Sequence, residues 1–180
     1  AGTAGKLAMF TQPSATAASG VVLATAPVVQ LQDVNSNPVT TSNVPITASI
    51  ASGPGGTLSS SIAATDASGR ATFTGLTITG PIGVYTLQFN GANLTGVTSN
   101  AITLTAGAPT QLAVISQPAT AQSGIAFAIA PTVQVQDAVG NPVSGSKSIS
   151  VAKNSGTAVL SGPTPQSTNA SGLATFPGLI

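Results

Sequence analysis

The stretch Gln30-Leu31-Gln32-Asp33 is followed closely by Asn37-Pro38-Val39, and the pair returns about 104 residues later as Gln134-Val135-Gln136-Asp137 and Asn141-Pro142-Val143. In each copy, apolar and polar residues alternate before the Asp, which is the period of a β-strand with one buried face. The Asp and the Asn-Pro pair then supply turn residues. A strand and turn that recur at this spacing predict tandem copies of one β-module.

Two further landmarks keep the same order in both copies. Leu7 to Pro13 is matched by Leu112 to Pro118, and Ser68 to Phe73 is matched by Ser171 to Phe176. The offset drifts by only a residue or two, so the differences fit in turns. The copies therefore share one fold.

The repeat divides the chain into a complete module, residues 1–106, and a second module, residues 107–180, that lacks its last strands. We expect no counterparts of residues 78–105 in the second module, because the sequence stops just past the equivalent of Leu76. Missing strands would leave an apolar face open. Residues of the same chain or a strand of a neighbouring molecule would complete it, and self-association into fibres is a related expectation. The face is expected to include Val133, Val135, Ile149, Val151 and Phe176.

Period-two alternation and frequent turn residues run through the whole chain, and no stretch has a period of 3.6. This pattern predicts an all-β fold of tandem immunoglobulin-like sandwiches, the second one incomplete. The expected strands of the first module are 6–11, 27–33, 44–50, 57–62, 70–78, 83–90 and 100–105. Its expected inner layer is Val29, Leu31, Ile46, Ile50, Phe73, Tyr85, Leu87, Phe89, Ile102 and Leu104. Tyr85 resembles the tyrosine corner of such sandwiches.

The composition excludes several function classes. Only 4% of the residues are charged and the net charge is +1, so nothing favours binding to nucleic acid or to an anionic membrane. The chain has no Cys and no His, which removes disulfides and the commonest ligands of zinc. No apolar run is long enough to span a bilayer, so we expect no membrane insertion in this segment.

The turn motifs resemble those of the bacterial immunoglobulin-like repeats of invasin- and intimin-type surface proteins. In that family an Asp closes a strand, a Gly-Asn-Pro turn follows, and a Thr-Asp-x-x-Gly turn precedes a later strand. Here Ser36 stands where the second copy has Gly140, and Asn169 stands where the first has Asp66. The resemblance implies a non-catalytic, extracellular stalk, adhesin shaft or surface fibre of a bacterium, with neighbouring repeats of the same chain as its partners.

The residues of the predicted site are predicted to stabilise turns rather than to perform chemistry. We expect the carboxylates in the turns to accept backbone N–H bonds rather than to perform acid-base chemistry. With so few carboxylates we expect no calcium dependence and no cofactor. The predicted structural turn residues are Asp33, Asn37, Pro38, Asp66, Gly69, Asp137, Asn141, Pro142 and Gly172.

Three motifs have a chemical alternative. Ser144 and Lys147 have the Ser-x-x-Lys spacing of an acylating serine, but that chemistry needs a helix start and the segment is rich in Gly and Ser. Gly2 to Lys6 evokes a phosphate loop, but Leu7 stands where Ser or Thr belongs. Lys6 is the only candidate in the first copy for a Lys-Asn crosslink, and we interpret it as a solvated Lys. None of the three predicts an enzyme.

Two other functions stay open. Exposed loops at one end of a module could bind a carbohydrate or a protein, or the chain could be an accessory domain of a secreted hydrolase. Sugar platforms favour exposed Trp or Tyr, but Trp is absent and Tyr85 is expected in the core. The lack of an exposed aromatic platform favours the stalk interpretation.

Overall fold

The computed structural model describes residues 2–118 and 120–180, and these residues form strands, turns and loops without any helix. The all-β prediction is therefore confirmed. Among the described residues no helix is long and apolar enough to cross a membrane. The chain divides into two compact units, Ala1–Thr105 and Ala106–Ile180, called here the first and second unit. Residue 1, where the predicted first module begins, and residue 119 of the second lie outside the described residues.

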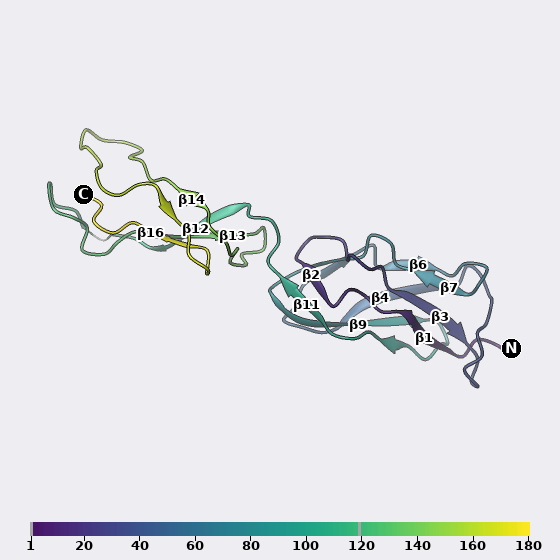
Figure 1. The fold of residues 1–180 in the computed structure, drawn as a ribbon. Helices are drawn as coiled ribbons and strands as arrows, with labels where there is room; N and C mark the ends of the chain where they lie inside the picture. Colours follow the sequence, from purple (N-terminus) through teal and green to yellow (C-terminus); the bar gives the residue numbers. More distant parts are fainter. Residues whose placement is uncertain (1, 119) are drawn as a thin grey trace. The chain divides into compact units, whose positions relative to one another are not determined.

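The first unit is an immunoglobulin-like sandwich of two main sheets and a short strand pair (Figure 1). One sheet has the order β1 (Lys6–Thr11), β3 (Val28–Gln32) and β7 (Arg70–Thr72). The other has the order β2 (Thr16–Ala18), β11 (Ile102–Thr105), β9 (Gly83–Gly91), β4 (Pro45–Ser52) and β6 (Ile62–Ala64), with β10 (Val97–Thr98) also on β9. The pair is β5 (Thr57–Ser59) with β8 (Thr77–Thr79).

The core of this unit lies between the sheets, where the alternating apolar residues meet. The rings of Phe73 and Phe89, from different sheets, lie 4.9 Å apart at their centres. Of the predicted inner layer, all residues are buried except Ile50, which is half-buried near the end of β4. The predicted phase of the alternation is thus confirmed. The core also contains residues that were not predicted, namely Leu7, Leu23, Val39, Ala48, Ala71, Leu76 and Ile78.

The number of strands was underestimated. The predicted strand 57–62 is two strands, because Ser60 takes a left-handed backbone (φ 53°) and sends β5 to β8 but β6 to β4. The predicted strand 70–78 also breaks, at Gly75 (φ 78°), into β7 and β8. The short strands β2 and β10 were not predicted at all.

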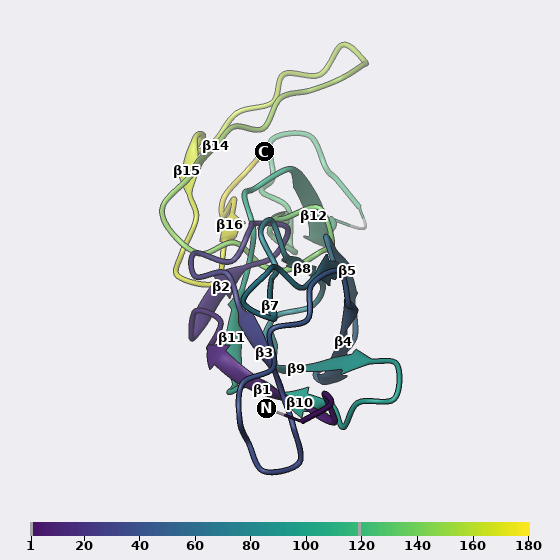
Figure 2. The ribbon, with the colours of Figure 1, turned by 90° about the vertical axis from the view of Figure 1, so that its right-hand side faces the viewer.

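The second unit has fewer and shorter strands. Its main sheet has the order β12 (Gln111–Ser116), β13 (Thr132–Gln136) and β16 (Leu173–Thr175), the counterpart of β1, β3 and β7. A separate pair joins β14 (Ser148–Ile149) to β15 (Gln166–Ser167), the counterparts of β4 and β6. Figure 2 shows the segment between β14 and β15 as a long loop. The described residues of this unit contain no counterpart of β9, β10 or β11.

The apolar face of the second unit is only partly as predicted. Val135 is buried in the central strand β13, and Phe176, which follows β16, is buried against Ala174 and Leu179, while Val133, Ile149 and Val151 are half-buried. The prediction that all five are exposed was wrong. Strand β12 is more exposed than its counterpart β1: Leu112 is 54% exposed, whereas Leu7 is 5% exposed.

Candidate functional site

The side chain of Asp33 lies at the end of β3 and holds the segment that leads into the first unit. Its Oδ2 accepts a hydrogen bond from the amide nitrogen of Gly2 at 2.8 Å and another from Asn37 Nδ2 at 3.0 Å. Its Oδ1 accepts from the amides of Asn35 and Asn37, at 3.0 and 2.9 Å. The carboxylate therefore closes its own turn and clamps a residue 31 positions earlier.

Asp137 repeats this arrangement in the second unit. Its Oδ2 accepts from the amide nitrogen of Gly107 at 2.8 Å and from Asn141 Nδ2 at 2.8 Å. Its Oδ1 accepts from the amides of Val139 and Asn141, at 3.0 and 2.9 Å. Each contact has a counterpart in the first unit, so both units carry the same clamp, called here the carboxylate clamp (Asp33 with Gly2, Asp137 with Gly107).

The second clamp acts on the segment that joins the two units. Thr105 is the last residue of β11, where it pairs with Ala18, and Gly107 is already bound to Asp137. Only residue 106 lies between these two attachments. Pro109, with its restricted backbone, follows closely.

The electrostatics of the clamps favour ionised carboxylates. The hydrogen bonds from Gly2 N, Asn37 Nδ2 and Asn37 N hold the pKa of Asp33 well below its usual range, against a smaller opposing effect of burial. For Asp137, burial raises the pKa, but the hydrogen bonds from Gly107, Asn141 and Val139 together lower it by more. The net pKa is therefore below the ordinary Asp value. Both groups carry a full negative charge at neutral pH.

The Pro and Asn residues of the predicted set complete the same turns. Pro38 forms an isolated bridge with Gln32, and Pro142 forms one with Gln136. Asn141 is buried whereas Asn37 is exposed, although both amides bond to their Asp. The predicted residues of each first turn thus lie together around one carboxylate.

Asp66 and Gly69 form a second turn, which does not reach the clamp. Asp66 Oδ1 accepts from the amides of Ser68 and Arg70, and Asn169 Oδ1 accepts from the matching amides of Ser171 and Leu173. Gly69 has φ 72°, and a Cβ built on it would lie 1.8 Å from the carbonyl oxygen of Val39. Gly172 has φ 71° and a similar but wider approach, 2.5 Å, to the oxygen of Val143. Glycine is required there by both conformation and space.

Tyr85 occupies the position of a tyrosine corner. Its ring is buried, and its hydroxyl lies 2.7 Å from the carbonyl oxygen of Pro81 and 2.6 Å from that of Gly55. Burial raises the pKa of this phenol. A bond back to a carbonyl four residues upstream is the feature expected of that corner.

The chemical alternatives find no supporting geometry in the described part of the chain. Ser144 and Lys147 are both exposed, and no helix begins between them. Gly2 to Lys6 is an entrance segment in which Gly2 donates to Asp33, and Lys6 Nζ donates to Ser36 Oγ at 2.7 Å. Residues 2–118 and 120–180 contain no group of three or more His, Cys, Asp or Glu that could hold a metal ion.

The donors Gly2 and Gly107 are the functional residues that sequence reasoning missed. The turn Asp residues were expected to accept nearby backbone N–H groups, and these two donors lie 31 and 30 residues away. A usable signal was present, since a Gly precedes the first strand of both copies at matching places. The sequence alone could not show that the Asp reaches it.

Comparison with known proteins gives one family. The family model described as SMCHD1 Ig-like domain 6 matches residues 3–106. None of the curated proteins compared with the chain matches it. The family match covers the first unit and supports its immunoglobulin-like fold, and such a domain is compatible with a non-catalytic structural or interaction module.

Proposed function

The chain belongs to the SMCHD1 Ig-like domain 6 family, and we propose from that premise that it is a non-catalytic structural repeat that builds a stalk or shaft. A stalk needs modules that repeat and joints that do not bend freely. Both units carry the same sandwich turns, and each fixes the segment that leads into it. The observation that carries the proposal is the repeated clamp, with Gly2 and Gly107 each 2.8 Å from the carboxylate of their unit.

The chemistry of the described residues supports this function. Asp33 and Asp137 are occupied by hydrogen bonds, and Asp66 closes a turn. The carboxylates are therefore committed to structure, which leaves no paired acid and base for catalysis.

The aromatic side chains favour a shaft over a sugar-binding module. Tyr85, Phe73, Phe89 and Phe176 are buried. Phe10 is exposed, but the guanidinium of Arg70 lies 3.6 Å from the centre of its ring and covers one face. Of the aromatic residues described, this leaves half-buried Phe127, so no flat aromatic platform is available.

The location is proposed from the resemblance of the turn motifs. Repeats of the invasin and intimin type lie outside bacterial cells, and a surface built from Ser, Thr, Asn and Gln suits a fibre that contacts other neutral surfaces. We therefore propose an extracellular or cell-surface bacterial location, with neighbouring repeats as partners. The test expresses the protein in its native host and treats intact cells with an external protease. We expect the protein to be cleaved, and full protection from the protease on intact cells would contradict the proposed location.

The joint is tested by distance measurements between spin labels. The chain has no Cys, so Thr47→Cys and Thr175→Cys, both exposed strand positions, place one label on each unit. We expect pulsed electron paramagnetic resonance to give a narrow distribution of the distance between the two spin labels. Asp137→Asn puts an amide where the carboxylate binds Gly107, and we expect a clearly broader distribution from this variant.

Asp66→Asn is the matched control, since Asp66 bonds only within its own turn and Asn169 already serves there in the second unit. Its distribution should keep the width of the parent chain. A parent distribution as broad as that of Asp137→Asn would contradict a stiff joint and with it the stalk function.

A further inference from the structure

The turn after β9 contains the residues Asn93-Leu94-Thr95. They have the pattern Asn-x-Ser/Thr, with a residue other than Pro in the middle, that marks an acceptor of an N-linked sugar. The pattern is common in a chain rich in Asn, Ser and Thr, so the geometry of the turn decides what it means. An acceptor needs an exposed turn, an Asn amide that is not engaged elsewhere, and an accessible hydroxyl two residues later.

Residues 91–94 form a tight turn at the surface. The amide nitrogen of Leu94 donates to the carbonyl oxygen of Gly91 at 3.2 Å, and Asn93 takes the left-handed conformation (φ 59°) that Asn tolerates better than most residues. The side chains of Asn93 and Thr95 are exposed. Within residues 2–118 and 120–180, neither the Asn93 side-chain amide nor the Thr95 hydroxyl has a hydrogen-bond partner. Both groups are therefore open to an enzyme.

The backbone holds these two side chains at the surface. Leu94 is half-buried and packs against the core, and its side chain lies over Gly91, where a Cβ would approach Leu94 Cδ1 to 2.8 Å. The amide of Thr95 donates to the carbonyl oxygen of Gly5 at 3.0 Å, and its own carbonyl oxygen accepts from the amide of Leu7 at 2.8 Å. The middle of the motif is thus anchored, while the residues on either side of it face solvent.

A second copy of the motif, Asn169-Ala170-Ser171, is held differently. Asn169 Oδ1 accepts hydrogen bonds from the amides of Ser171 and Leu173, at 2.9 and 3.0 Å. Because Oδ1 and Nδ2 lie in one plane, a transferase would have to break both bonds to turn this amide toward a sugar. The fold therefore leaves Asn93 available and withholds Asn169, although the motif itself does not separate the two.

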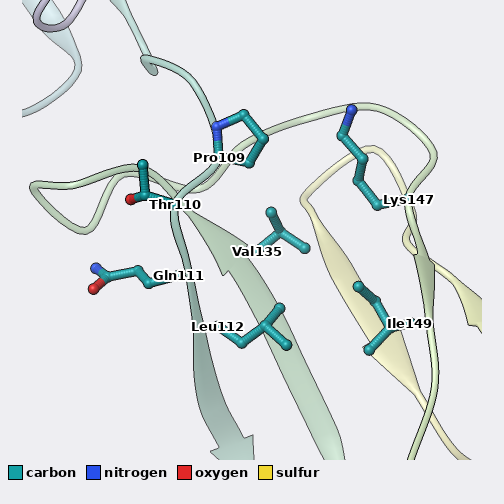
Figure 3. A pocket seen from close by; sticks show the side chains of 7 residues that line it. All are labelled: Pro109, Thr110, Gln111, Leu112, Val135, Lys147 and Ile149. Atoms are coloured by element: carbon teal, nitrogen blue, oxygen red, sulfur yellow. The ribbon is translucent and has the colours of Figure 1, made fainter.

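The hollow shown in Figure 3 is not an alternative site for a sugar. Its volume is about 450 Å³, and the side chains of Leu112, Val135 and Ile149 point into it, with Lys147 at one margin. Of the described residues that line it, none is aromatic, whereas a sugar ring is usually held by an aromatic face together with several polar groups. A covalent link at the surface is the better-supported route for a carbohydrate.

We propose that Asn93 of the folded first unit is an N-glycosylation site. The co-substrate is a sugar activated by a diphosphate, which a nucleotide or a lipid carries. Nδ2 of Asn93 bonds to the anomeric carbon, the bond from that carbon to the diphosphate oxygen breaks, and one Nδ2 proton passes to a base of the transferase. The nucleoside diphosphate or the lipid diphosphate is the leaving group. This modification goes beyond the stalk function and does not depend on it.

The protein isolated from its native host tests the proposal directly. Trypsin cuts after Lys and Arg, so the two motifs fall on separate peptides, which begin at residues 71 and 154. Mass spectrometry should find a sugar on the first peptide, localised to Asn93 by fragmentation, and none on the second. A single hexose would identify a nucleotide-activated donor, and a whole oligosaccharide a lipid-linked one. An unmodified first peptide, or equal modification of both peptides, would overturn the proposal.

Substitutions separate an N-linked sugar from one on a nearby hydroxyl. Asn93→Gln removes the acceptor and Thr95→Val removes the hydroxyl of the motif, so each should abolish the sugar on the first peptide. Asn100→Gln, at an exposed Asn outside any such motif, is the matched control and should leave the sugar in place. A sugar that survives Asn93→Gln would be linked to another side chain and would overturn the assignment.

A reaction in solution tests whether the fold selects the site. A soluble N-glycosyltransferase with UDP-glucose should modify Asn93 of the 180-residue chain at least about tenfold faster than Asn169, because Asn169 first has to lose two hydrogen bonds. Synthetic peptides of residues 89–99 and 165–175, which lack the fold, should react at similar rates. Equal rates in the folded chain, or the same preference in the peptides, would overturn the structural argument.

Discussion

Strand β4 of the first unit runs for eight residues, whereas its counterpart β14 in the second unit runs for two. The two sequences alternate alike, Ile46-Thr47-Ala48-Ser49 in one and Ile149-Ser150-Val151-Ala152 in the other. The difference is the neighbouring strand: β4 pairs with β9 along most of its length, whereas in the part of the chain that the structure describes β14 pairs with β15 alone. An alternating pattern thus defines which face is apolar, but a partner strand is needed to extend the ladder.

The largest expected effect comes from β9, which among the residues described has a counterpart in neither sheet of the second unit. Phe89→Ala should lower the free energy of unfolding of the first unit by about 3–5 kcal/mol, because Phe89 is fully buried against Phe73. The chain has one Tyr and no Trp, so the fluorescence of Tyr85 in urea reports the first unit alone. A loss below about 0.5 kcal/mol would show that β9 does not hold this core together.

Phe127→Ala is the matched change in the second unit. Phe127 belongs to the second unit and Tyr85 to the first, so truncation of Phe127 should leave the Tyr85 transition where it is. A shift of that transition would mean that the two units do not unfold separately, and the comparison between them would lose its basis.

A smaller effect is expected at the shared glycine. Gly69→Ala should cost on the order of 2–3 kcal/mol, because φ is positive and the new Cβ would strike the carbonyl of Val39. Gly172→Ala should cost less, since the corresponding distance is 2.5 Å rather than 1.8 Å and the second unit has fewer strands to hold its backbone in place. Thermal melts of both variants check the order; a larger loss at Gly172 would reverse it.

Acid should weaken both units through their clamps. The pKa values of Asp33 and Asp137 are lowered in the fold, so the stability they contribute is complete above the ordinary Asp pKa and is lost as the pH falls below about 4. Calorimetric scans should show a flat melting temperature from about pH 5 to 8 and a fall of several degrees toward pH 3. Asp33→Asn should reduce the slope for the first unit. An unchanged slope would place the acid sensitivity elsewhere.

The smallest effect concerns a turn position where the first unit has Ser and the second has Gly. Ser36 takes φ 67° and its counterpart Gly140 takes φ 89°. Ser36→Gly should stabilise the first unit by about 0.5 kcal/mol, and Gly140→Ser should destabilise the second by about 1 kcal/mol, because only Gly takes this conformation without strain. Lys6→Gln is the control that removes the Lys6–Ser36 hydrogen bond alone. Stabilisation by Gly140→Ser would contradict the backbone argument.

The sequence predicted the parts of the fold that depend on local alternation. Strands β1, β3, β4, β9 and β11 and nearly the whole inner layer follow from it. The breaks at Ser60 and Gly75 were missed because they depend on which sheet each half joins. Strand β2 was missed because its three residues form a strand only beside β11, to which they run parallel.

The sequence predicted which residues form the clamps, but not that each Asp binds a backbone amide about 30 residues away. Each turn Asp could be assigned as a backbone acceptor, since short side chains in turns commonly bond to the residues that follow. The bonds from Gly2 and Gly107 bring together residues about 30 apart, and only the folded sheet sets that distance. The pairing of β14 with β15, residues about 18 apart, is also set by the fold and not by the local sequence.

Hydrogen exchange of the 180-residue chain tests the central claim most directly, that alternation becomes a stable strand only where a partner such as β9 is present. The account predicts that amides of residues 46–52 exchange at least about 10³-fold more slowly than unprotected amides. Amides of residues 150–153 should exchange within about tenfold of the unprotected rate. Equal, strong protection of both segments in the monomeric chain would contradict the account.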